Sequence, residues 1–151
     1  MRGFKSVKKE CQKYPRIETV LPTRSDNGSA GYDFYLKRSI ILKPGETQLI
    51  FSDVKAYMQP DEVLYLYIRS GISLNQKINF INSVGVIDST YFENPKNDGN
   101  IGFTLTNNND EHVMLKEGER VAQGVFMKYL TADNDNVQNE KRNGGFGSSG
   151  K

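Results

Sequence analysis

The chain has 151 residues, a length that favours one domain with its own hydrophobic core. Its 20 Lys and Arg residues nearly balance 18 Asp and Glu residues, and the net charge of +2 argues against a strongly basic nucleic-acid scaffold and a polybasic membrane binder. The single cysteine, Cys11, and the single histidine, His112, exclude an intrachain disulfide, a cysteine-rich zinc site and a multi-histidine metal site within one chain.

The N-terminal segment and the short apolar runs bear on the cellular location of the protein. Residues 1–10 are charged and no apolar stretch follows them, which is unlike a secretory signal. The longest apolar run, 63–68, is far shorter than the roughly 20 residues that span a bilayer. A chain with one cysteine is typical of a reducing compartment. We therefore expect a cytoplasmic protein that binds neither membrane nor nucleic acid.

Apolar and polar residues alternate along most of the chain, as they do in half-buried strands. In 63–69, for example, Leu64, Leu66 and Ile68 fall on one face. The alternation, interrupted by turns rich in Gly, Pro, Asn and Asp and without a long amphipathic helix, indicates an all-β sandwich or barrel. The expected strands cover residues 17–21, 32–36, 47–51, 54–58, 63–69, 78–82, 84–87, 100–106 and 121–129, with one helical turn at 73–77.

The C-terminal segment differs from the rest in composition. Residues 132–143 are almost all polar, and residues 144–150 are rich in glycine and serine. Such a segment cannot bury enough apolar surface to order itself. We therefore divide the chain into a β-domain, 1–131, and a flexible tail, 132–151.

The tail carries groups that suit a nucleotide. Glycine amides and the Ser148 hydroxyl can wrap an anion, Arg142 adds positive charge, and Phe146 is suited to stacking on a base. The alternative is a terminus without function in which the aromatic residue is accidental.

Asp88 and Tyr91 follow the apolar strand 84–87. Aspartate is unfavourable in strands, so a carboxylate at this place needs an explanation. A partly desolvated carboxylate has a raised pKa and can take a proton from water, whereas the alternative is an aspartate that opens a turn. Tyr91 is either a core residue or a platform for a sugar.

Three other positions carry polar groups that could be functional. Arg69 ends a regular strand and precedes Ser70 and Gly71, a combination suited to an oxyanion; the alternative is a surface arginine. Gln123 is an amide inside an apolar strand and needs backbone or ligand partners. Asp33 lies opposite the apolar face of its strand, where a solvated carboxylate is the alternative to a functional one.

Five motifs taken together resemble the trimeric dUTP diphosphatase (dUTPase) family, although each motif alone is weak. They occur in the family's order between residues 30 and 150, which makes the match highly specific. The motifs are Ala30-Gly-Tyr-Asp-Phe-Tyr35, Arg69-Ser-Gly-Ile72, Asn82-Ser-Val-Gly-Val-Ile-Asp-Ser-Thr-Tyr91, Gly118-Glu-Arg-Val-Ala-Gln123 and Arg142-Asn-Gly-Gly-Phe-Gly-Ser-Ser-Gly150.

The resemblance implies a distorted jelly-roll-like β-barrel or sandwich subunit of a homotrimer. Three active sites would lie between subunits, each closed by a C-terminal tail. The implied reaction is Mg²⁺-dependent hydrolysis of dUTP to dUMP and diphosphate, which limits uracil incorporation into DNA and supplies dUMP for dTMP synthesis. The resemblance leaves room for an additional regulatory protein partner.

The resemblance also implies a role for each matching residue. Asp88 would be the general base that activates water for in-line attack on the α-phosphorus, and Asp33 would hold the Mg²⁺ through water. Tyr91 would pack under the sugar and leave no room for a 2′-hydroxyl. The remaining substrate-binding residues would be Arg69, Ser70, Gly71 and Gln123 at the phosphates, Asn82, Val86, Ile87 and Gly102 at the deoxyuridine, and Arg142, Phe146, Gly147 and Ser148 in the tail, where Phe146 would stack on uracil.

The sequence departs from the family pattern at two places. Residues 92–100 form an insertion in the hairpin that bounds the expected uracil pocket, close to the expected main-chain contact near Gly102. Gly124 follows Gln123 where the family usually has a bulky apolar residue, so we expect looser packing there.

Two other functions compete with this one. A dCTP deaminase shares the fold but carries a Glu where this chain has Thr104 and a Trp where it has Tyr91, and the chain contains no Trp. A protein-binding regulatory module could use 92–100 as its partner loop. Such a module would not need Asp33 and Asp88, and both are present.

Overall fold

The computed structural model describes residues 1–137, and every strand pair in this part is antiparallel. A four-stranded sheet has the order β2-β11-β6-β8 and a three-stranded sheet the order β4-β9-β7, while β1 pairs with β5 and β3 with β10. The strands are β1 (Gly3–Ser6), β2 (Tyr32–Tyr35), β3 (Ile40–Leu42), β4 (Thr47–Phe51), β5 (Val54–Tyr57), β6 (Glu62–Ile68), β7 (Ile78–Phe80), β8 (Gly85–Asp88), β9 (Gly102–Asn107), β10 (Val113–Leu115) and β11 (Arg120–Lys128).

The hydrophobic core joins the two larger sheets. The ring of Phe34 on β2 meets the ring of Phe103 on β9 edge to face, with centroids 5.5 Å apart, and Phe80 on β7 stacks on Phe103 at 5.9 Å. Leu64 and Leu66 of β6 are fully buried, as their alternation predicted. These contacts make the fold an all-β sandwich, which confirms the expected class.

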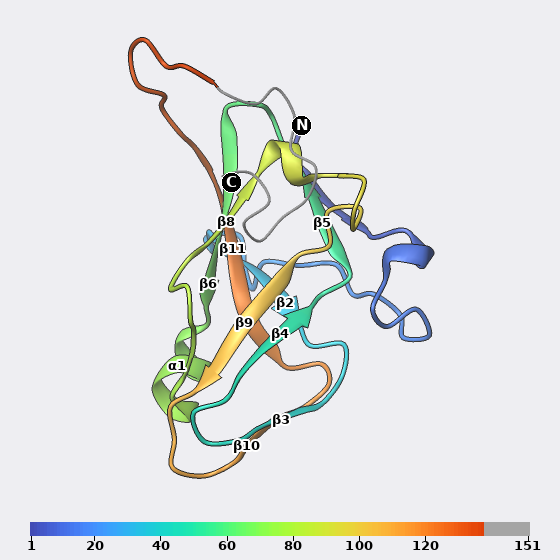
Figure 1. The fold of residues 1–151 in the computed structure, drawn as a ribbon, viewed down its shortest axis with the longest axis vertical. Coiled ribbons are helices and arrows are strands. Elements are labelled where there is room, and N and C mark those ends of the chain that lie inside the picture. Colours follow the sequence, from blue (N-terminus) through green and yellow to red (C-terminus); the bar gives the residue numbers. More distant parts are fainter. Residues whose placement is uncertain (138–151) are drawn as a thin grey trace.

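Figure 1 shows how this architecture places the ends of the strands. The paired strands β6 and β11 run side by side along the length of the molecule, and α1 (Ser70–Gln76) lies just beyond one end of β6. The 3-10 helix η2 (Ser89–Tyr91) follows β8, and β8 flanks β6 on the side opposite to β11. The four-stranded sheet therefore has two ends at which loops and polar side chains gather.

The predicted strand 17–21 is wrong. This segment has no partner strand, and only Thr23 beyond it forms an isolated bridge, to Asp33. Val20 and Leu21 are exposed and Ile17 is only half-buried, so the segment has no buried face. A two-residue alternation predicts a strand only where one face is buried.

Three strands and part of a helix were not predicted. β1 lies in the charged N-terminal segment, but it pairs with β5 and is followed by the buried Val7. β3 and β10 are short and pair only with each other. The expected helical turn at 73–77 is a longer helix, α1, which ends where Lys77 adopts a left-handed backbone, φ 52°.

The two 3-10 helices are η1 (Lys9–Cys11) and η2. Within residues 1–137, no helix combines the length and apolar character that crossing a bilayer requires.

The backbone of Gly124 is packed more tightly than expected. A Cβ added there would come within 2.9 Å of Leu64 and 3.1 Å of Phe34. The space of the family's bulky side chain is therefore already filled by neighbouring core residues, and the looser packing that we expected is not found.

Candidate active site

An open hollow of about 530 Å³ lies beside one end of the four-stranded sheet. It brings together three of the predicted site residues: Asp33, Arg69 and Gln123. The complete lining is Ser25, Ser29, Ala30, Gly31, Asp33, Tyr67, Arg69, Gln123 and Val125.

The strand register explains why these residues meet. On β11, Gln123 lies opposite Asp33 of β2 and opposite Tyr67 of β6. Arg69 follows β6 directly and its N–H donates to the Val121 carbonyl, 3.0 Å away, which fixes the strand end beside the hollow. A side chain at Gly31 would clash with the Gln123 amide, so glycine keeps the hollow open at that point.

The Asp33 carboxylate is surrounded by hydrogen-bond donors. Arg69 Nε lies 3.1 Å from Oδ1, while Arg120 Nη1 and Ser25 Oγ donate to Oδ2 at 3.4 and 3.1 Å. The residue is only 4% exposed, so the solvated-carboxylate alternative is wrong. Two guanidinium groups next to one buried carboxylate leave donor capacity that a polyphosphate can use.

Arg120 and Ser25 have no role in the sequence prediction. Arg120 falls inside the fourth motif, so the motif itself contained the signal. Ser25 lies in an irregular loop, and only the three-dimensional structure brings it to the carboxylate.

Ser70 and Gly71 begin α1 next to this hollow. Both are exposed, and a Cβ at Gly71 would meet nothing within 4 Å. Their main-chain groups are therefore accessible to a ligand that is held by Arg69.

A second group of predicted residues lies on the other side of β6. Asp88 is the last residue of β8, is half-buried and pairs with Val63 of β6. It occupies the N-cap position of η2 but makes no side-chain capping hydrogen bond there. Asp88 therefore stands at the start of a helical turn, as the turn-opening alternative expects, but does not cap that turn through its side chain.

The residues predicted to bind the base lie in the turn between β7 and β8, on β8 and at the start of β9. Thr104 Oγ1 of β9 donates to Asn82 Oδ1 at 2.9 Å, and Asn82 Nδ2 donates to the Val84 carbonyl at 3.5 Å. Val86 is exposed, while Ile87 and Gly102 are half-buried. Thr104, the position at which a dCTP deaminase carries a Glu, therefore lies beside Asn82.

Tyr91 is a core residue in this structure. It is 3% exposed and belongs to the main hydrophobic cluster. Its hydroxyl donates to the Asn100 carbonyl at 2.6 Å and accepts from Asn97 Nδ2 at 2.8 Å. The core-packing alternative is confirmed, and the sugar-platform role stays a prediction.

The insertion 92–100 is attached to the β-domain through a buried ion cluster. Lys55 Nζ lies 2.8 Å from Asp98 Oδ2 and 2.9 Å from Glu93 Oε1, and the Lys8 amide also donates to Asp98 at 2.8 Å. Burial raises the pKa of Asp98, but the hydrogen bonds from Lys55 and Lys8 outweigh it and the net pKa is lowered. Likewise, burial lowers the pKa of Lys55 but its two carboxylate partners raise it overall.

The two groups of residues are far apart within one chain. Asp88 is opposite Val63 and Gln123 is opposite Tyr67, on the two sides of β6. With strands about 4.8 Å apart and a rise of about 3.4 Å per residue, the backbones of Asp88 and Gln123 are roughly 17 Å apart. One phosphate group is therefore not expected to contact the Asp88 and Gln123 side chains of the same chain.

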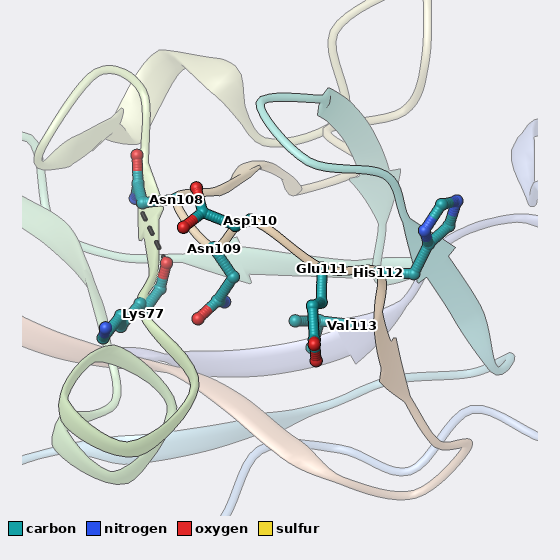
Figure 2. A pocket seen from close by; sticks show the side chains of 7 residues that line it. All are labelled: Lys77, Asn108, Asn109, Asp110, Glu111, His112 and Val113. Atoms are coloured by element: carbon teal, nitrogen blue, oxygen red, sulfur yellow. Dashed lines mark hydrogen bonds between the residues drawn. The ribbon is translucent and has the colours of Figure 1, made fainter.

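A second hollow, of about 340 Å³, lies at the turn between β9 and β10 and gathers none of the predicted residues. Figure 2 shows Asp110, Glu111 and His112 pointing in different directions along its lining. Within residues 1–137, no three His, Cys, Asp or Glu side chains are grouped so as to hold a metal ion.

The predicted tail residues Arg142, Phe146, Gly147 and Ser148 lie outside the described residues.

The chain is thus an all-β sandwich in which a carboxylate, an arginine and an amide line one hollow. The family model for dUTPase matches residues 18–150, and the chain belongs to the dUTPase family. This membership confirms the resemblance that the five motifs carried.

Individual relatives agree with this assignment. A protein of Lactococcus lactis subsp. lactis, named deoxyuridine 5′-triphosphate nucleotidohydrolase, is 46% identical over 151 residues, covering 99% of this chain and 98% of the relative. The crystal structure of dUTPase from Streptococcus mutans has a TM-score of 0.77 and 40% identity, covering 87% of this chain and 99% of that one.

A more distant structure shares the fold alone. A mutant dUTPase from phage phi11 of S. aureus is 20% identical with a TM-score of 0.69, covering 92% of this chain and 97% of that one. That structure reveals the coordination of a structural Mg(II) ion in the phage protein.

Proposed function

We propose that this protein is a dUTP diphosphatase that hydrolyses dUTP to dUMP and diphosphate. The observation that carries the proposal is the hollow around Asp33, in which Arg69 and Gln123 of two further motifs converge. Family membership and the 46% identical nucleotidohydrolase support the same activity. The lone cysteine fits the cytoplasmic location that we propose with it.

Asp88 acts as the general base in this proposal. Its half-buried carboxylate at the end of β8 takes a proton from a water, which attacks the α-phosphorus in line with the leaving diphosphate. A base placed in this way accelerates hydrolysis by about 10²–10⁴. Arg69 and Gln123, with Ser70 and Gly71, bind the phosphate oxygens on which negative charge develops.

Asp33 suits a magnesium ion that is bound chiefly by the triphosphate. Mg²⁺ keeps several waters and needs only one or two carboxylates besides substrate phosphates. A single buried carboxylate at the edge of the phosphate hollow meets that need, and Asp33 would hold the ion through water. When bound, the ion neutralises phosphate charge.

The uracil pocket is proposed beside the turn between β7 and β8, at β8 and the start of β9. The Asn82 side chain and main-chain groups of Val86, Ile87 and Gly102 would supply the donors and acceptors that read the uracil edge. Thr104 beside Asn82 has no carboxylate with which to relay protons, which disfavours a dCTP deaminase.

We propose that the complete site is formed between copies of the chain in a homotrimer. The roughly 17 Å between the backbones of Asp88 and Gln123 within one chain supports this arrangement, because one phosphate group is not expected to contact both. One copy would supply Asp88 and the base pocket, and another would supply the phosphate hollow. The tail, with Arg142, Phe146, Gly147 and Ser148, would close the site.

The test is diphosphate release with Mg²⁺ from dUTP, dCTP, dTTP and UTP. We expect activity on dUTP alone, and expect Asp88→Asn to lower kcat by about 10²–10⁴ while dUTP still binds. Asp110→Asn is the matched control, since this exposed carboxylate lies in the turn before β10 and should leave kcat unchanged. Unchanged turnover by Asp88→Asn would refute the assignment of the base, and ammonia release from dCTP would favour a deaminase.

A further inference from the structure

The insertion 92–100 makes a directed hydrogen-bond chain to the hydroxyl of Tyr91. Asn97 Oδ1 accepts from the Gly99 N–H at 3.1 Å, and a backbone N–H can only donate. The amide orientation of Asn97 is therefore fixed, and its Nδ2 points to Tyr91 Oη at 2.8 Å. The tyrosine in turn donates its single proton to the Asn100 carbonyl at 2.6 Å.

The loop that presents Asn97 is held by contacts of its own. Asn94 Nδ2 donates to the Tyr91 carbonyl at 2.9 Å and to Asn97 Oδ1 at 2.7 Å. Gly99 has φ 85°, and a Cβ there would come within 2.9 Å of the Tyr91 carbonyl, so the loop returns directly over the tyrosine backbone. The buried pair of Lys55 and Asp98 attaches the same loop to β5.

We propose that Asn97 is a positioning residue that enables Tyr91 to select deoxyribose over ribose. This inference rests on the proposed dUTP hydrolysis. A ring that is buried along its length and bonded at its far end by a donor and an acceptor cannot move aside for an additional 2′-hydroxyl. The insertion thereby acquires a role in substrate choice, exerted through the tyrosine and not through contact with the nucleotide.

The Asn97→Asp substitution isolates the donor. The aspartate keeps an oxygen for Gly99 N–H and Asn94 Nδ2, but it faces Tyr91 Oη with an acceptor in place of a donor. One tyrosine proton then serves two acceptors, so the Asn100 carbonyl or the new carboxylate loses its partner. Losing one such hydrogen bond corresponds to a fall of about 3–10-fold in the ratio of kcat/KM for dUTP to kcat/KM for UTP.

The experiment measures this ratio in the wild type, Asn97→Asp, Tyr91→Phe and the double variant. Asn97→Ser serves as a second variant should Asn97→Asp fail to fold, and Lys96→Ala is the control, because Lys96 is an exposed neighbour in the same loop. We expect each single variant to lower the ratio by about 3–10-fold, mainly through faster UTP hydrolysis, and expect kcat for dUTP in Asn97→Asp to stay within about twofold of wild type. In the double variant the ratio should be no lower than in Tyr91→Phe, because Asn97 then has no hydroxyl to act on.

The outcomes separate this inference from the function on which it rests. A wild type that fails to prefer dUTP over UTP overturns the proposed function and the inference with it. A wild type that prefers dUTP, with an unchanged ratio in Asn97→Asp, overturns the inference alone. An effect of Asn97→Asp that is equally large in the Tyr91→Phe background, or loss of folding in both Asn97 variants, makes the residue merely structural and also overturns it.

Discussion

Replacing Lys55 by Met should destabilise the protein strongly, because it leaves two carboxylates without their common partner. Lys55 is 4% exposed, its Nζ lies 2.8 Å from the equally buried Asp98, and Asp98 keeps only Lys8 once the ammonium is gone. Removing one member of a buried, hydrogen-bonded pair typically costs about 3–5 kcal/mol. We expect a loss near the lower figure, about 3 kcal/mol, because the Lys8 amide still donates to the Asp98 carboxylate.

The assay is urea unfolding at one fixed protein concentration, since an oligomer's stability depends on concentration. Lys128→Met is the matched control: Lys128 and Asp61 also form an ion pair, at 3.3 Å, but both are exposed, so the loss should stay below about 1 kcal/mol. The double variant Lys55→Met/Asp98→Asn should recover part of the lost stability, and asparagine tolerates the φ of 58° at position 98. Equal losses for Lys55→Met and Lys128→Met would refute the claim that a buried ion cluster anchors the insertion.

Two further predictions concern the chain ends. Arg2 donates to the Glu62 carboxylate at 2.9 and 3.0 Å and lowers the pKa of that carboxyl to about 2. The ion pair's contribution to stability is therefore complete above the ordinary pKa of 4.5 and is lost as pH falls towards 2. Tm measured from pH 6 to pH 2 should differ most between wild type and Glu62→Gln near pH 6, and a difference that stays constant with pH would contradict the assignment. Removing residues 142–151 should lower dUTP turnover at least about tenfold without changing the oligomeric state by size-exclusion chromatography, and full activity of the truncated chain would argue against the tail as a lid.

Alternation along the chain predicted the strands that have a buried face. Thr47–Phe51 is a strand with the predicted bounds, and β6 carries its buried leucines where the pattern put them. The pattern failed where tertiary pairing decides. Gly3–Ser6 is a strand because β5 offers it a partner, and residues 17–21 are not, because no strand pairs with them.

The sequence motifs predicted which residues belong to the candidate site, but not how these residues come together in space. The convergence of Asp33 and Arg69 depends on strand order, which no single motif encodes. Ser25 reaches Asp33 from a loop without regular structure, so its sequence neighbourhood carries no signal. The contact of Asn97 with Tyr91 likewise depends on the path of the insertion, which the sequence marked only as additional length.

The central claim is that Asp88 of one copy works with Arg69 of another, and a subunit-mixing experiment tests it most directly. Asp88→Asn and Arg69→Ala chains, each nearly inactive alone, are unfolded together, refolded as an equal mixture and assayed for diphosphate release from dUTP. If each site takes these two residues from different copies, about a quarter of the sites in random assemblies contain both intact residues, and the mixture should regain about that fraction of wild-type activity. A mixture that assembles but stays as inactive as its two components would contradict the account.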